Sequence, residues 1–338
     1  MKCSLKDIAK SLNLSVTTVS WVLSGNGDNR HISPETQELV KKKAKEMNYE
    51  PNLLAKSLSN GSTKTIGLII PSISDLFYAQ IAKSVELEAE KSGYTIIFCS
   101  SESDSKREAS LIKTLRQKRV DGIIIAPTKK SDVYIKNMVE EDFPLVLFDR
   151  YYPEIKTNYV IIDNEESSYQ VVRKVIEEGR KKIAIITTNS YLLLMKERYK
   201  GYKRALNEKG IQLDKSLFVE VKVNDYESEL KLAFDDLFSK HPDIDGFFFT
   251  THILAIEALT YLSVRYHDMN TRFGFACIHE APLLRTLAPN MKVALMPIDE
   301  IGRMSASILM QDISNQRKKK TNIVQPEKIT LVLSSKIL

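Results

Sequence analysis

The most constraining feature of the sequence is a series of short, continuously apolar segments that begins near residue 65. In segments such as 66–70, 122–125 and 246–249, apolar residues follow one another without alternating polar positions. Continuous apolar runs predict strands that are covered on both faces. Segments with helical periodicity lie between the runs, so the pattern predicts βαβ units and parallel sheets.

The number of these segments indicates two sheets. Eleven strands are too many for one doubly wound sheet in a chain of 338 residues, whereas two successive sheets of five or six strands fit, with a boundary near residues 161–164. Paired α/β subdomains of this kind bind ligands in the cleft between them, at the carboxyl ends of the strands. The predicted strands are 66–70, 95–98, 122–125, 145–148, 160–162, 183–186, 218–221, 246–249, 273–275, 293–295 and 329–332.

The first sixty residues have helical signals and no alternating strand. Apolar residues at helical spacing predict helices near 5–12 and 16–23, and Ser33-Pro34-Glu35 predicts the start of a third. Two short helices joined by a short turn and closed by a third describe a helix-turn-helix, although a generic three-helix bundle has the same spacing. The inward residues expected on the second and third helices are Val19, Val22, Leu23, Leu39, Val40, Ala44 and Met47.

Composition excludes several classes of protein. Apolar residues make up 43% of the chain and charged residues 27%, which excludes wholesale disorder and coiled coil. The three cysteines are too few and too scattered for a disulfide framework, so we expect a reducing compartment. The N-terminus lacks the apolar core of a signal peptide, and no stretch approaches the roughly 20 apolar residues of a membrane span. We therefore expect a cytoplasmic protein without membrane association.

Charge and motifs favour a binding protein over an enzyme. The net charge is +6, and residues 1–60 hold nine lysines and arginines against six acidic residues, a surplus of three that permits an anionic partner. The sequence has no GxGxxG after a strand, no P-loop, no GxSxG and no HExxH. We therefore predict no enzymatic activity and no cofactor. His252, Cys277 and His279 lack a spacing that compels a metal site, so no metal is predicted either.

A series of motifs, in order along the whole chain, resembles the LacI/GalR family of bacterial repressors. Those of the head and linker are SLKDIAK (4–10), LSVTTVS (14–20), VLSG (22–25), ISPET (32–36), NYEPN (48–52) and AKSL (55–58). Those of the body are IGLIIP (66–71), VDGII (120–124), FDR (148–150), RYKGY (198–202) and EIGR (300–303).

The resemblance implies a dimeric regulator with a helix-turn-helix head at 1–50, a hinge helix at 51–63 that enters the minor groove, and a periplasmic-binding-protein-like body at 64–338. The body is expected to divide into subdomains of about 64–162 plus 293–325, and 163–292 plus 326–338. No leucine heptad follows the last predicted strand, so the resemblance implies a homodimer that reads a pseudo-palindromic DNA operator.

The resemblance also implies which residues contact DNA. Val16 and Thr17 occupy the positions that select the base sequence, and Val16 is limited to apolar contacts. Trp21 stands where many relatives carry arginine; it either contacts DNA or packs on the head or hinge. His31 either contacts DNA or is solvated, and Leu58 either wedges between base steps or belongs to the core of the hinge. The predicted DNA-binding residues are Leu5, Ser15, Val16, Thr17, Thr18, Ser20, Trp21, His31, Asn52, Ala55 and Leu58.

The implied effector cleft departs from that of sugar-binding relatives, which grip hydroxyls with Asn-Asp, Asp-Asp and Gln. The matching positions read Thr251-His252, Ala276-Cys277 and Met296. Ala276 and Met296 offer sugar hydroxyls no useful hydrogen bond, so a smaller apolar or anionic ligand, or none, is favoured over an ordinary hexose.

The remaining cleft positions keep polar groups. Arg198 has the geometry to clamp a carboxylate or phosphate, and Arg150 either assists it or pairs with Asp149. Phe77 and Tyr78 either stack on a ligand ring or belong to the core. The predicted effector-binding residues are Phe77, Tyr78, Asp149, Arg150, Arg198, Thr251, His252, Ala276 and Met296.

The sequence thus predicts an allosteric transcriptional repressor whose DNA affinity responds to a small-molecule effector in the cleft. Within the same class, the alternative is a body that responds to a protein coregulator or serves only as a dimerisation platform.

Overall fold

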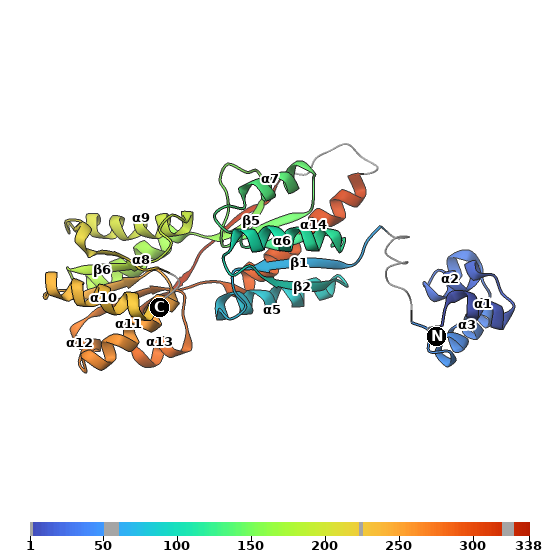
Figure 1. Ribbon diagram of the computed structural model, residues 1–338, viewed down its shortest axis with the longest axis horizontal. Coiled ribbons are helices and arrows are strands. Elements are labelled where there is room, and N and C mark those ends of the chain that lie inside the picture. Colours follow the sequence, from blue (N-terminus) through green and yellow to red (C-terminus); the bar gives the residue numbers. More distant parts are fainter. Residues whose placement is uncertain (1–2, 51–60, 223–225, 320–327) are drawn as a thin grey trace. The chain divides into compact units, whose positions relative to one another are not determined.

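The computed structural model describes residues 3–50, 61–222, 226–319 and 328–338 of the chain (Figure 1). It forms two compact units, which divide between Thr63 and Lys64. We call the first the head and the second the body, and each is described by itself. Three predicted DNA-binding residues, Asn52, Ala55 and Leu58, lie outside the described residues, as does most of the predicted hinge.

The head contains the three predicted helices, α1 (Leu5–Leu12), α2 (Val16–Leu23) and α3 (Pro34–Glu46), with a 3₁₀ turn, η1 (Asp28–Arg30), before α3. Each helix is capped locally, because the side chains of Ser4, Ser15 and Ser33 accept hydrogen bonds from backbone N–H groups of the first turn. The buried core of the head consists of Ile8, Ala9, Val19, Val22, Val40 and Ala44.

One predicted inward residue of the head was wrong. Leu39 keeps 50% of its surface exposed, whereas its neighbour Val40 is completely buried. Successive residues of an α-helix point about 100° apart, so the narrow face of α3 that meets α1 and α2 includes Val40 and Ala44 but leaves Leu39 in solvent.

The first sheet of the body has the strand order β11-β5-β4-β3-β1-β2, and its strand pairs are all parallel. Buried side chains of α5 and α14 pack on one face, and those of α6 and α7 pack on the other. The elements are β1 (Thr65–Ile70), α5 (Leu76–Lys91), β2 (Thr95–Ser100), α6 (Ser105–Gln117), β3 (Ile123–Ile125), α7 (Asp132–Glu140), β4 (Leu145–Phe148), β5 (Asn158–Ile162), α14 (Ile298–Lys319) and β11 (Thr330–Leu333).

The second sheet has the order β12-β10-β9-β8-β6-β7, parallel except for the antiparallel pair of β10 and β12. Side chains of α8 and α9 cover one face, and those of α10 and α11 cover the other. The elements are α8 (Asn164–Glu177), β6 (Ile183–Thr187), α9 (Leu193–Glu208), η2 (Lys215–Leu217), β7 (Phe218–Glu220), α10 (Tyr226–Lys240), β8 (Gly246–Phe249), α11 (His252–Arg265), α12 (Met269–Arg272), β9 (Gly274–Ile278), α13 (Pro282–Leu287), β10 (Lys292–Leu295) and β12 (Lys336–Ile337).

The predicted fold class is confirmed, but two strands lie in the sheet opposite to the one expected. Residues 293–325 were assigned to the first subdomain, yet β10 pairs with β9 in the second sheet. Residues 326–338 were assigned to the second, yet β11 pairs with β5 in the first. The described elements therefore imply three crossings between the subdomains: from β5 to α8, from β10 to α14, and from β11 to β12.

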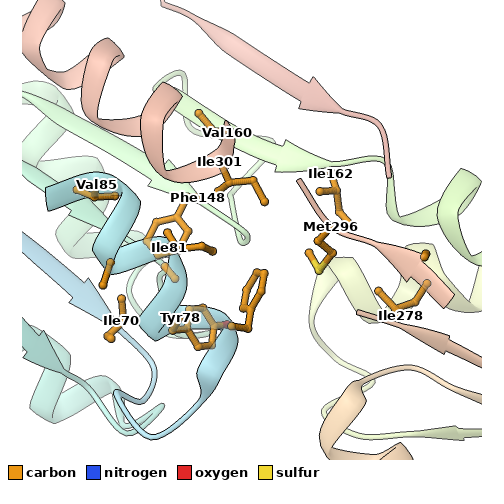
Figure 2. Packing of buried hydrophobic residues seen from close by; sticks show 14 of the residues in the cluster. Ile70, Tyr78, Ile81, Val85, Phe148, Val160, Ile162, Ile278, Met296 and Ile301 are labelled. Carbon is orange, nitrogen blue, oxygen red and sulfur yellow. The ribbon is translucent and has the colours of Figure 1, made fainter. Parts of the chain in front are cut away.

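Coverage on both faces explains the continuous apolar runs. In β1, Leu68 and Ile70 pack in the cluster that includes α5 and α14, whereas Ile69 packs in the cluster that includes α6 and α7. Figure 2 shows the cluster that includes α5 and α14, near Phe148 of β4. In the same view, Ile278 and Met296 of the second subdomain lie opposite Tyr78. The buried cluster therefore continues from one subdomain into the other.

Candidate DNA-binding surface and effector cleft

Helix α2 presents its N-terminal residues to solvent. Val16 keeps 40% of its surface exposed and Thr17 is also exposed, whereas Val19 is fully buried and anchors the helix in the head. The hydroxyl of Ser15 accepts a hydrogen bond from the N–H of Thr18 (2.9 Å) and lies 2.8 Å from its hydroxyl oxygen. This local bonding fixes the first turn of α2 and leaves the side chains of Val16 and Thr17 available for DNA base edges.

Trp21 lies on the same helix and is half-buried. The guanidinium carbon of Arg30, in η1, lies 4.8 Å from the centre of the indole ring. Trp21 therefore contacts another residue of the head, and a contact of Trp21 with DNA stays a prediction. The contact with Arg30 was not predictable from the sequence, because no periodicity or motif relates a loop residue to a side chain nine positions earlier.

The other predicted residues of the head differ in exposure. His31 is exposed and has a positive φ of 54°, in the left-handed region. Thr18 and Ser20 are half-buried on α2. Leu5 is also half-buried, and it packs against the core of the head, which leaves only part of its side chain for a partner.

A cavity of about 700 Å³ lies between the two subdomains of the body, where the carboxyl ends of strands from both sheets meet. Doubly wound sheets bind ligands at this edge. Eight of the nine predicted effector residues line the cavity: Phe77, Tyr78, Asp149, Arg150, Arg198, Thr251, His252 and Met296.

The ninth predicted residue, Ala276, was wrong. It is completely buried inside β9 and does not line the cavity. The strand continues to Ile278, so Ile278 and His279 occupy the cavity edge at its carboxyl end. The strand sequence GFACI has no charged residue that would mark where the strand ends, which explains why Ala276 was expected at its edge.

One wall of the cavity carries a buried polar network from the first subdomain. The hydroxyl of Tyr78 donates a hydrogen bond to Asp149 Oδ2 (2.7 Å), and Arg150 Nη2 donates to the Tyr78 oxygen (3.4 Å). Arg150 Nε also lies 3.6 Å from Asp149 Oδ2. Burial raises the pKa of Tyr78 well above its usual value, so the phenol stays protonated and keeps donating to Asp149. Arg150 therefore pairs with Asp149, one of the two roles left open.

Arg198 lies on the opposite wall and is only 4% exposed. Its Nε donates to Asn164 Oδ1 (2.9 Å) and its Nη1 donates to the carbonyl oxygen of Thr250 (2.5 Å). Both acceptors are neutral, and no carboxylate among the described residues forms an ion pair with Arg198. Burial lowers the pKa of its guanidinium, because a buried cation loses its hydration. The cavity thus contains a fixed positive charge that a ligand anion would neutralise.

A second group of polar side chains connects the two subdomains across the cavity. His252 Nε2, in the first turn of α11, lies 3.4 Å from Asp75 Oδ1 at the start of α5. The rings of His252 and His279 meet edge to face at 4.7 Å, and the ring of Phe77 lies 5.0 Å from that of His279. Burial acts to raise the pKa of Asp75, but the hydrogen bond and charge of His252 outweigh it, and the pKa is lowered.

Two members of this group were not predicted as effector residues. Asp75 caps α5 by accepting a hydrogen bond from the N–H of Phe77 (2.9 Å), and an aspartate before an apolar helical run is a recognisable N-cap. The N-cap pattern predicts that α5 begins after Asp75. In the structure this N-terminus of α5 lies at the cavity, and Asp75 lines it. The sequence predicts a strand that ends at residue 275, whereas β9 ends at Ile278, so His279 at the cavity edge was missed as an effector residue.

The head and the body together define a class: a helix-turn-helix protein whose body encloses a ligand-sized cavity between two parallel-sheet subdomains. Two family models match this chain. One describes bacterial regulatory proteins of the lacI family and matches residues 4–52, and the other describes periplasmic binding proteins and the sugar-binding domain of the LacI family and matches residues 63–262.

Relatives along the full chain are also regulators. The HTH-type transcriptional regulator DegA of Bacillus subtilis is 30% identical over 335 residues, 98% of this chain and 97% of its own. A ribose operon repressor of Halalkalibacterium halodurans is 29% identical over 93% of this chain and 91% of its own. The chain belongs to the LacI family of DNA-binding transcriptional regulators and is not an enzyme.

A solved structure shows the same fold. The lac repressor dimer bound to operator and an anti-inducer superimposes with a TM-score of 0.84 at 18% identity, covering 100% of this chain and 98% of that one. Among the described residues, no helix is both long and apolar enough to cross a membrane.

Proposed function

We propose that this LacI-family repressor binds a pseudo-palindromic operator as a homodimer, and that a small molecule in the cavity between the subdomains controls its affinity for DNA. Exposed Val16 and Thr17 on α2 read base edges, and phosphate contacts of the basic head supply much of the affinity. By resemblance, Asn52, Ala55 and Leu58 act in the minor groove. Two copies related by a two-fold axis then require a two-fold operator.

The observation that carries the effector proposal is the composition of the cavity wall. Arg198 supplies a buried cation without a carboxylate partner among the described residues, whereas Asp149 is already engaged by Tyr78 and Arg150. Much of the remaining wall is apolar: Leu76, Phe77, Leu192, Met195, Ile253, Ile278, Leu283 and Met296. This surface suits a ligand with an apolar or ring-shaped body and one anionic group better than a neutral hexose, which needs many hydrogen-bonding partners.

The position of the cavity supports control by the ligand. Asp75 and His252 belong to different subdomains, and their contact at 3.4 Å is part of the cavity wall. A ligand that binds better to one relative arrangement of the subdomains shifts the population toward it, and the coupling to DNA is limited by that difference in affinity.

The proposal is tested by a thermal-shift panel on the full chain with sugars, sugar acids, sugar phosphates, nucleobases and organic acids. A ligand at about a hundred times its dissociation constant adds ~2.7 kcal/mol to stability, which moves the melting point measurably. We expect anionic compounds to shift it and to change operator affinity. If no compound shifts the melting point and only a partner protein alters DNA binding, the body is a coregulator module instead.

A further inference from the structure

Another cavity of the body, of about 380 Å³, lies at the outer edge of the second sheet, where β7 is the last strand. Side chains of α9 line it together with residues of η2 and the first residue of β7, Phe218. We call this cavity the outer pocket. Met195 of α9 lines both the outer pocket and the cavity between the subdomains, but none of the predicted effector residues lines the outer pocket. The outer pocket is therefore a separate site, and its volume falls within the range of small-molecule sites.

Four lysines line the outer pocket: Lys196, Lys200 and Lys203 of α9 and Lys215 of η2. Among the described residues, no carboxylate forms an ion pair with any of them. The three lysines of α9 follow the spacing i, i+4 and i+7, so they share one face of the helix, where like charges repel one another. An anionic ligand in the outer pocket would remove this repulsion.

The nearest acidic side chain of α9 does not neutralise this face. Glu197 is close enough for the charge of Lys200 to lower its pKa, but burial outweighs that charge and the pKa is raised. Its carboxylate accepts a hydrogen bond from Asn164 Nδ2 (3.4 Å), and Glu197 is not a lining residue of the outer pocket. The lysines therefore keep their positive charge toward the pocket.

Apolar side chains lie beneath the lysines. Met195 is buried, and Tyr199 and Phe218 are half-buried with their rings edge to face at 5.1 Å. Lys203 Nζ lies 4.7 Å from the centre of the Tyr199 ring. Cation–π attraction holds this ammonium group at the pocket, and its N–H donors stay available to a ligand. The outer pocket thus combines an apolar base with several cations above it.

We propose that the outer pocket binds an organic phosphate of the nucleoside-diphosphate class. Lysine binds phosphate as a point charge, and the apolar base suits the organic part of such a ligand. With a rise of 1.5 Å per residue, Lys196 and Lys203 are about 10 Å apart along α9, so a ligand with more than one phosphoryl group meets cations at both ends. This inference does not depend on the effector proposed for the cavity between the subdomains.

The test is isothermal titration calorimetry of the full chain with ADP, at low ionic strength because salt screens exposed charges. Adenosine and inorganic pyrophosphate are titrated for comparison. We expect ADP to bind, pyrophosphate to bind more weakly because it lacks the organic part, and adenosine to give no measurable heat of binding. Binding of ADP that is no tighter than that of adenosine or pyrophosphate, or no binding of ADP at all, would overturn the proposed ligand class.

Variants then locate the bound ADP. The double variant Lys200→Gln/Lys203→Gln should lose roughly 10-fold to 150-fold in ADP affinity, because it removes two charged donors, and Lys215→Gln should also weaken binding. Lys209→Gln is the matched control, since Lys209 is an exposed lysine directly after α9 that does not line the outer pocket. Circular dichroism checks that each variant is folded.

Two results with the variants contradict the inference. Unchanged ADP binding by the double variant means that ADP occupies another site. An equal loss in the double variant and in Lys209→Gln means that ADP responds only to the general charge of the surface. Neither result bears on operator binding or on the effector cavity, so the proposed function is tested separately.

Discussion

Protonation of one buried histidine is expected to weaken the body at mildly acidic pH. Burial, and to a lesser extent the charge of neighbouring His252, lowers the pKa of His279 from 6.5 to about 3. The other charged groups that act on it are Asp75, which favours its protonation, and Arg198, which opposes it. The unfolded chain takes up this proton more readily than the folded one. The stability that neutral His279 contributes is therefore fully present above pH 6.5 and is lost as the pH falls toward 3.

The size of the effect follows from these two pKa values. Each pH unit below the pKa of His279 in the unfolded chain lowers the free energy of unfolding by up to about 1.4 kcal/mol. Between pH 7 and pH 5, the free energy of unfolding falls by about 2 kcal/mol. Asp75 contributes little in this range, because its pKa is lowered from 3.8 and its stabilisation is lost only at lower pH.

The perturbation that isolates this effect is His279→Asn. Asparagine is neutral at every pH in the range and tolerates the positive φ of 70° at this position. Urea unfolding of both proteins is followed by far-ultraviolet circular dichroism at pH 7 and pH 5. We expect the wild type to lose about 2 kcal/mol more than the variant, because titrating groups common to both proteins cancel in the difference. Equal losses would refute a neutral, buried His279.

Three further predictions concern other sites. Gly201→Ala should destabilise the body by about 1–3 kcal/mol in urea unfolding, since its Cβ would lie 2.1 Å from the Glu165 carbonyl oxygen; a loss below 0.5 kcal/mol would contradict that close packing of α8 and α9. Arg198→Ala should abolish the response of operator binding to an anionic effector and leave effector-free binding intact, and an unchanged response in anisotropy removes Arg198 from the site. Leu58→Ala should weaken binding to the operator far more than to random duplex, whereas equal losses would exclude a wedge between base steps.

Most of the fold could be predicted because its signals are local. Continuous apolar runs mark strands whose neighbouring residues, such as Leu68 and Ile69, pack on opposite faces of one sheet. Serine caps and helical spacing similarly determine the helices of the head. The sheet to which a late strand belongs is not a local property. The apolar runs of β10 and β11 carry no information about their partners, and both were assigned to the wrong subdomain.

The site was predicted less completely for a related reason. Polar residues that match a family motif, such as Asp149 and Arg198, can be found by position alone and do line the cavity. His279 depends on where β9 ends, which shifted by a few residues within an apolar segment. Arg30 contacts Trp21 from a loop that is hydrogen-bonded to Gln37 of another helix, and such a contact between distant positions has no signature in a single sequence.

The exchange of strands near the end of the chain has a consequence for synthesis on the ribosome. β5 pairs with β11 on its outer side, and β10 pairs with β12, so the outer sides of β5 and β10 stay unpaired until residues 330–337 have left the exit tunnel. An open edge of parallel strands invites pairing with other chains. The head is a separate compact unit at the start of the chain, whereas both sheets of the body are completed by the same final segment. A nascent body therefore needs protection from aggregation until translation is almost finished.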